Sequence, residues 1–434
     1  MGVKMGAASA RTFASLKRHR NYRLYFIGQV VSLSGTWMQN VAMAWFVVVL
    51  THGSAFAVGA LALCQFGPYA IGGLFGGTLT DRLNARKALI GTQSAMMVAA
   101  IVLTILAMTG VAQLWEVFVL ATVNGTVLIL DTPVRQSFTI EMVGRDELPN
   151  AIALNSSLFN ASRVLGPAIA GLLIAAVGVG ICFLINALSF VAVVAALLAM
   201  REEDLFPINR GGTRPALFRG IGEGLVYAWR TPTVRLVLLM MLLLATISLN
   251  FNVLMPVLTS QTLHAGPEVF GLISGAFGLG ALAGALTSAA VSRASLRLLL
   301  GGGFGFGLTL LVLAPLHTLW AVCVTLLFTG FAFSVYGSQS NASLQMAVSD
   351  RLRGRVMSLY GYVFFGTAPV GGLLTGWLCG QFGTWVYLLV AGGVAAVSIA
   401  GGAFSVRRGG FQLPQRRRQV PVGGGDASAM GARE

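Results

Sequence analysis

Three ionisable side chains lie inside otherwise apolar stretches of this sequence: Asp131, Arg135 and Arg163. Asp131 and Arg135 are four residues apart, so on a helix they share one face and can form an ion pair. Arg163 has no acidic residue close to it in the sequence. Charged groups at such depth in an apolar segment face a protein interior or a water-filled cavity and are candidates for function. For Asp131, a gating or structural role and proton carriage both stay open, including a simple pairing with Arg82 or Arg86.

Other chemistries have little support in the sequence. The four His residues are isolated, and the four Cys residues lie in apolar stretches without metal-ligand spacing. There is no nucleophile–base arrangement and no Gly-rich loop with the Lys-Ser/Thr ending that cradles ATP phosphates. We therefore expect no enzyme, no catalytic residues, no metal, no cofactor and no ATP-driven pump.

Composition places the elements around these charges in a membrane. Mean hydropathy is +0.79, 56% of residues are hydrophobic and only 10% are charged, which excludes an ordinary soluble domain. The net charge of +15 would elsewhere suggest nucleic acid. Here the basic residues are scattered over loops, which favours membrane lipids as the contact and excludes a nucleic-acid partner.

Twelve apolar stretches are long enough to cross a bilayer. They lie at 24–49, 57–79, 88–109, 115–138, 152–177, 180–200, 234–258, 269–290, 297–315, 319–345, 356–379 and 384–405. The predicted fold is an all-α membrane protein of two six-helix, pseudo-symmetric halves. The predicted divisions are an N-terminal segment 1–23, halves at 24–200 and 234–405, a linker 201–233 with an interfacial helix, and a disordered basic tail 406–434.

Basic residues predict the orientation of these spans. Apart from Arg163, Lys and Arg occur in the N-terminal segment, in every second loop and in the tail, whereas the alternate loops carry none. Cytoplasmic loops of inner-membrane proteins are enriched in Lys and Arg. We expect a multi-pass protein of the plasma membrane, of the bacterial inner-membrane type, with both termini in the cytoplasm.

The two halves resemble each other. The segment after the second span contains Asp81-Arg82 and the segment after the eighth span contains Ser292-Arg293 at the same offset. Gly166-Pro167 in the fifth span has a counterpart, Ala368-Pro369, in the eleventh. Two parallel repeats of six spans predict a transporter whose binding site lies between the halves near the membrane midplane.

The run from Gly77 to Lys87 can hold one conformation of such a protein closed. It contains small residues that let helices approach, together with one carboxylate and a group of cations; its key residues are Gly77, Asp81, Arg82, Arg86 and Lys87. The run resembles the loop signature between the second and third spans of the major facilitator superfamily, with Asn84 and Ala85 as departures. The resemblance implies a cytoplasmic gating motif.

Gly166, Pro167 and Gly171 form a second motif. They resemble the antiporter signature of exporting branches of the superfamily, with Ser162 and Ala170 replacing two of its glycines. Pro167 frees a backbone carbonyl and is expected to bend the helix, while the small residues allow close packing. A generic packing kink is the other interpretation of this motif, so the motif favours export without establishing it.

Further stretches narrow the resemblance to one branch. They are Asn21-Tyr22-Arg23, Ser34 to Asn40, Asp131 to Gln136, Ala153 to Ser156 and Arg353 to Ser358. These stretches are similar to the branch with the enterobactin exporter and the macrolide and multidrug efflux proteins. The resemblance implies proton-driven export of a hydrophobic or siderophore-like small molecule by alternating access. The first span lacks an Asp or Glu, which puts antiport through the usual carboxylate in doubt.

Polar and aromatic side chains of the first, fifth and seventh spans are the candidate cavity residues. They are Thr36, Trp37, Gln39, Asn40, Asn160, Asn250 and Asn252. Each could instead form an interhelical hydrogen bond. Such a cavity suits a bulky amphipathic solute. An uptake permease of the same fold and a non-transporting membrane sensor stay open, as do the solute, the coupling ion and its residue; a monomer is expected.

Overall fold

The computed structural model describes residues 14–80, 83–206, 217–291, 294–348 and 350–406. Within these residues, 12 helical segments are long and apolar enough to cross a membrane. The predicted all-α membrane fold with twelve spans is therefore confirmed. Residues 407–434 of the predicted tail and most of the N-terminal segment 1–23 lie outside the described residues.

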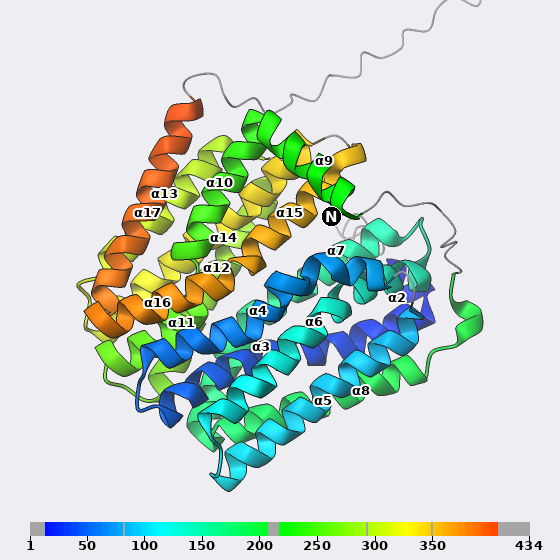
Figure 1. Cartoon of the computed structure of the whole chain (residues 1–434), viewed down its shortest axis with the longest axis horizontal. Helices are drawn as coiled ribbons and strands as arrows, with labels where there is room; N and C mark the ends of the chain where they lie inside the picture. Colours follow the sequence, from blue (N-terminus) through cyan, green and yellow to red (C-terminus); the bar gives the residue numbers. More distant parts are fainter. Residues whose placement is uncertain (1–13, 81–82, 207–216, 292–293, 349, 407–434) are drawn as a thin grey trace, which may run out of the picture.

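Helices of the first half form one bundle, coloured blue to green in Figure 1. They are α2 (Ala14–Arg18), α3 (Arg20–Leu50), α4 (Ala55–Thr80), α5 (Ala85–Thr109), α6 (Leu114–Val143), α7 (Leu148–Val177) and α8 (Val179–Leu198). Each apolar span is helical because the bilayer leaves no water to pair exposed backbone groups, so the hydrogen bonds must close within the helix.

Helices of the second half form the other bundle, coloured green to orange-red in Figure 1. They are α10 (Pro232–Ile247), α11 (Phe251–Val257), α12 (Pro267–Val291), α13 (Leu296–Leu313), α14 (Leu319–Ala347), α15 (Asp350–Gly366), α16 (Ala368–Phe382) and α17 (Thr384–Ser405). A π-helical turn, η2 (Leu258–Thr262), extends α11. Two spans differ from the uninterrupted helices expected: α10 gives way to α11 at 248–250, and α15 gives way to α16 at Thr367.

The linker contains the short helical turn η1 (Glu202–Asp204) and the helix α9 (Leu217–Arg230). α9 packs on the second bundle, where Glu223 forms an ion pair with Arg355 and the Tyr227 hydroxyl donates to the Ala347 carbonyl at 3.4 Å. Leu225 and Trp229 on α9 are exposed. An amphipathic helix with such an apolar surface is suited to a membrane interface.

The two bundles come closest at one end of the structure shown in Figure 1. They converge near α4, α11 and α16 and separate towards α2 and α9. We call the first end, which carries the loops at 51–54, 263–266 and 383, the hairpin face, and the second end the terminal face. The site described below lies between the bundles.

Candidate functional site

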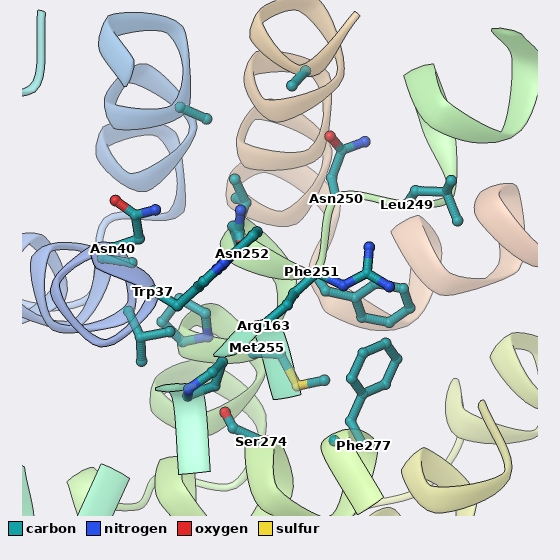
Figure 2. A pocket seen from close by; sticks show the side chains of 18 of the residues that line it. Trp37, Asn40, Arg163, Leu249, Asn250, Phe251, Asn252, Met255, Ser274 and Phe277 are labelled. Carbon is teal, nitrogen blue, oxygen red and sulfur yellow. The ribbon is translucent and has the colours of Figure 1, made fainter. Parts of the chain in front are cut away.

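A pocket of about 170 Å³ lies between the two bundles. Its lining comes from α3, α4 and α7 of the first half and from α10, α11, α12, α14, α15 and α16 of the second. The lining is mostly aromatic and aliphatic, with a few amide groups and one guanidinium (Figure 2). Predominantly apolar walls with a few placed polar groups are typical of small-molecule sites.

Four of the predicted cavity residues line this pocket: Trp37, Asn40, Asn250 and Asn252. Figure 2 shows Trp37 and Asn40 from α3 on one side and Asn250 and Asn252 from the interrupted seventh span on the other. The side chains predicted from the two halves are thus brought together in one place. Trp37 also packs against Phe159 of α7, with ring centroids 5.7 Å apart.

Two other predicted cavity residues do not line the pocket. The Thr36 hydroxyl donates to the Ser32 carbonyl of its own helix at 2.9 Å. Gln39 is buried and accepts a 2.8 Å hydrogen bond from the Asn186 side chain of α8. On α3, neighbouring positions point in different directions, and Gln39 faces its own bundle. The Asn160 side chain lies outside the described residues.

The interruption of the seventh span is what brings Asn250 and Asn252 to the pocket. Backbone carbonyls freed at the break are paired by side chains: the Tyr387 hydroxyl donates to Ile247 at 2.8 Å, and the Asn250 amide donates to Thr246 at 3.0 Å. The Ser248 hydroxyl in turn donates to the Ala391 carbonyl at 2.8 Å. Irregular backbone at membrane depth is tolerated where it is paired in this way or lines a cavity.

Arg163 lies on α7 and reaches into the same pocket (Figure 2). Its guanidinium carbon sits 5.3 Å from the centroid of the Phe333 ring of α14. Phe333 belongs to a cluster with Phe251, Phe277 and Phe306, in which Phe251 and Phe277 are the tightest pair at 4.5 Å between centroids. A cation over an aromatic face is attracted by the ring quadrupole. No pattern in the sequence predicted that Arg163 would contact a ring of the other half.

Glycines close the pocket towards the hairpin face. A Cβ on Gly171 of α7 would lie 1.9 Å from the Cα of Gly271 of α12, and one on Gly59 of α4 would lie 2.6 Å from the Gly372 carbonyl of α16. The loops touch as well, since Gln261 donates to the Gly53 carbonyl at 2.9 Å. Only residues without a side chain permit helices to approach this closely.

The antiporter-like motif contributes to this packing. Gly166 meets α3 so closely that a Cβ there would lie 2.5 Å from the Trp37 Cβ, and Gly171 provides the contact with α12. Pro167 lines the pocket, and α7 runs through it as one helix from Leu148 to Val177. The motif therefore joins α7 to both bundles at the pocket wall.

Asp131 and Arg135 form a polar cluster inside the first bundle. Asp131 is only 2% exposed, and both the Nη2 (2.6 Å) and Nε (3.2 Å) atoms of Arg135 donate to its Oδ2. Thr92 and Gln93 of α5 each donate to Oδ1 at 2.8 Å. The Asp131 carboxylate therefore accepts four hydrogen bonds, two from Arg135 and one each from Thr92 and Gln93.

Gln29 completes the cluster from α3, because its side-chain oxygen accepts from Arg135. Gln29, Thr92 and Gln93 were missed as site residues. The signal available for them was their polarity in apolar spans, which by itself identifies no partner. Asp131 does not line the pocket, and its partner is Arg135 rather than Arg86.

In the predicted gating motif, Arg86 binds the end of α8. It donates to the carbonyls of Leu197 at 2.8 Å and Leu198 at 3.1 Å, and it forms a 2.5 Å ion pair with Glu202. The backbone amide of Lys87 donates a 3.0 Å hydrogen bond to the Asn84 side-chain oxygen, which caps the start of α5. Asp81, Arg82 and the surroundings of Gly77 lie outside the described residues.

Two of the stretches that resemble the efflux branch, Asn21-Tyr22-Arg23 and Ala153 to Ser156, lie next to each other in the structure. The Tyr22 hydroxyl contacts both the Ala151 carbonyl and the Asn155 side chain at 3.1 Å, so α3 is bound to α7 on the terminal face. Asn21 exchanges two hydrogen bonds with the backbone of Arg201, at 2.7 and 3.1 Å. These motif residues hold the first bundle together at the start of the linker.

Two six-helix bundles around a shared pocket define the class of protein: a multi-pass membrane transporter with the major facilitator fold. Residues 10–417 match the family described as transmembrane secretion effector, and the chain belongs to this family of the superfamily. The fold is similar to the crystal structure of a bacterial homologue of the human lysosomal transporter Spinster, in an inward-facing and unoccupied conformation. The TM-score is 0.69 at 14% identity, covering 91% of this chain and 99% of that one.

Curated relatives carry efflux names. Macrolide efflux protein A of Streptococcus pyogenes is 25% identical over 87% of this chain and 95% of its own length. The multidrug efflux pump Tap of Mycolicibacterium fortuitum is 28% identical, covering 79% and 85% respectively. The enterobactin exporter EntS of Shigella boydii is 26% identical, covering 80% and 82%. The predicted superfamily and branch are confirmed.

Proposed function

We propose that this protein is a secondary exporter that moves an amphipathic small molecule across a bacterial inner membrane by alternating access. The observation that carries the proposal is the pocket, which both halves line and which glycine contacts close on one face. Rocking one bundle against the other around a fixed site is how such repeats carry a solute across. Each monomer contains its own pocket, so the proposed unit is a monomer surrounded by lipid.

Alternating access requires the two faces to open in turn. To open the hairpin face, Gly171 must leave Gly271 and Gly59 must leave Gly372. The bundles then approach on the terminal face, where the segment with Asp81 and Arg82 is proposed to act as a latch. The terminal face is proposed to be cytoplasmic, because the basic residues lie in the loops on that side.

Export and a drug-like or siderophore-like solute are supported by two features. Relatives at 25–28% identity carry the names of macrolide, multidrug and enterobactin efflux proteins. The pocket combines aromatic walls with the amides of Asn40, Asn250 and Asn252, which fit a bulky solute with polar groups.

Proton coupling is proposed to occur at the Asp131–Arg135 cluster. α3 carries Gln29, which binds Arg135, and further along the same helix it carries Trp37 and Asn40, which line the pocket. A change of protonation at Asp131 would loosen Arg135 from Asp131, and because Arg135 also donates to Gln29 of α3, a shift of the guanidinium would bias the position of α3. Proton and solute would then act on one helix from separate places, which is a physical basis for coupling.

The decisive experiment is transport into everted inner-membrane vesicles, with a macrolide and a catecholate siderophore as probes. An exporter accumulates a probe inside the vesicles when the interior is acidified, and a proton ionophore abolishes the accumulation. Vesicles without the protein are the control. Energised loss of a preloaded probe would instead indicate an uptake permease, and no dependence on the protein with either probe would contradict this assignment of function.

Orientation has its own test. A single cysteine at position 263, on the hairpin face, is expected to react with an impermeant reagent outside intact cells. A cysteine at position 212 in the linker is expected to stay protected until the cells are opened. The reverse labelling pattern would overturn the proposed topology.

A further inference from the structure

Arg163 is the one charged side chain among the described residues that line the pocket. It lies near the middle of α7, and no carboxylate forms an ion pair with it within the described residues. The Arg163 guanidinium carbon lies 5.3 Å from the centroid of the Phe333 ring, which attracts a cation but carries no net charge. The wall of the pocket therefore holds a positive charge that its described surroundings do not neutralise.

A half-buried cation in such a place is costly unless something negative comes to it. Asp131, the buried acid of the same bundle, is already held by Arg135, Thr92 and Gln93. Described acids elsewhere, such as Glu202 and Glu223, are paired on the protein surface. The counter-charge is thus expected to arrive with the solute.

We propose that the pocket selects solutes in which an anionic group, of the carboxylate type, is attached to an aromatic body. This inference rests on the proposed function, in that it takes this pocket to be the solute site. The anion would bind the guanidinium of Arg163, whose planar fork matches a carboxylate. The aromatic body would lie against Phe251, Phe277 and Phe333, which surround that end of the pocket.

Two amides extend the same site. Within the described residues, neither Asn40 nor Asn252 has a protein hydrogen-bond partner for its side chain, and both line the pocket. Their N–H groups are free to donate to further solute oxygens, whereas the Asn250 amide is already bonded to the Thr246 carbonyl. A cationic solute could not form the ion pair with Arg163, and its charge would be repelled by the like charge of that guanidinium.

The test uses three probes that share one ring system and differ in charge: 2-naphthoate, 2-naphthamide and 2-naphthylmethylamine. Binding to the purified full-length protein is measured by equilibrium dialysis at pH 7 in a non-ionic detergent, so that the micelle has no charge preference. The wild-type protein is expected to bind naphthoate about tenfold or more tightly than naphthamide, since one hydrogen bond to a charged group is worth at least that factor. The amine is expected to bind most weakly.

Arg163→Gln is expected to abolish the preference for naphthoate, and Arg163→Lys is expected to keep part of it. The matched control is Arg235→Gln, because Arg235 also lies over an aromatic ring, at 5.7 Å from the Trp229 centroid, but outside the pocket. It should leave the preference unchanged. The wild-type comparison needs no variant, so it remains decisive even where Arg163→Gln does not fold.

A wild-type protein that binds naphthoate no better than naphthamide, or that binds neither, overturns the inference. So does an Arg163→Gln protein that keeps the full preference. The outcome is separate from that of the transport experiment. Anion selectivity without energised transport would contradict the proposed exporter, and energised transport without anion selectivity would contradict the inference alone.

Discussion

Equivalent positions in the two halves carry different chemistry. α6 and α14 occupy matching places in the repeats, and Asp131 lies as far along α6 as Tyr336 lies along α14. Likewise, Arg135 corresponds to Ser340. The first half therefore holds an ion pair between the buried Asp131 and the half-buried Arg135, where the second half holds two buried hydroxyl groups. The comparison indicates that the first half is specialised for charge.

The two halves also differ in the regularity of their backbone, and here the second half is the unusual one. α3 and α7 of the first half are continuous, and α7 passes through Pro167 without a break. Their counterparts in the second half are interrupted at 248–250 and at Thr367. The second half thus supplies irregular backbone and two amides, Asn250 and Asn252, to the pocket, and the first half supplies Arg163, the Asn40 amide and a more regular framework. The two halves have the same fold, but they contribute different groups to the pocket.

The largest effect on transport is expected from removing the carboxylate of Asp131 in the first half. Asp131→Asn should abolish pH-gradient-driven export, because an amide cannot exchange the proton and leaves Arg135 without its counter-charge. Loss of one partner of such a pair also destabilises the protein, by about 3–5 kcal/mol where the pair is fully buried. Solute binding and exchange at equal pH should remain measurable in proteoliposomes.

Tyr336→Phe, at the corresponding position of the second half, is the matched control and should transport nearly as well as the wild type. The double variant Asp131→Asn, Arg135→Gln separates the two roles of the pair. If it regains gradient-driven export, Asp131 is a structural partner of Arg135, and the coupling residue lies elsewhere.

The next largest effect is expected where the halves touch. Gly171→Ala should disfavour the conformation closed on the hairpin face, because its Cβ would lie 1.9 Å from the Gly271 Cα. Labelling of a cysteine at position 252 from the hairpin face should rise several-fold, since about 1 kcal/mol shifts a two-state equilibrium by that factor. Gly393→Ala, which meets open space, should change nothing. Equal labelling of the two variants would show that this contact does not gate the pocket.

A smaller, several-fold effect is expected at the terminal face. Asp81→Asn should reduce transport more than it reduces protein abundance, because the proposed latch would lose its carboxylate, and the charged contacts proposed for it are each worth about 1–3 kcal/mol. Its repeat counterpart, Ser292→Ala, should matter little, because the second half lacks the carboxylate. Both residues lie outside the described part of the structure. Transport and immunoblot quantification of both variants check the asymmetry, and equal defects would refute it.

The smallest effect concerns the break in the second half. Tyr387→Phe leaves the Ile247 carbonyl without its 2.8 Å donor and should lower the free energy of unfolding by about 1 kcal/mol. Thr287→Val removes a hydroxyl from an intact helix, where it donates to the Ala283 carbonyl, and should be close to neutral. Thermal unfolding in detergent compares the two variants. Equal stability of both would mean that the break needs no such cap.

Predictions from the sequence were strongest where a single physical constraint acts along the chain. The bilayer requires about 20 apolar residues for each span, so the twelve spans and both bundles were predicted close to their ends, as for α17 at Thr384–Ser405. The pairing of Asp131 with Arg135 was likewise predictable, because residues four apart share a helix face.

Which polar side chains reach the pocket was decided only by the tertiary structure. Gln39 and Asn40 are neighbours on α3, yet one binds Asn186 of α8 and the other lines the pocket. The contacts of Arg163 with Phe333 and of Gln29 with Arg135 join residues far apart in the chain, because the packing of whole helices sets their distances. The sequence by itself determined the spans, the family and the positions of the charges. Only the folded bundles decided which of these groups meet, because helix rotation and the break at 248–250 depend on contacts between spans.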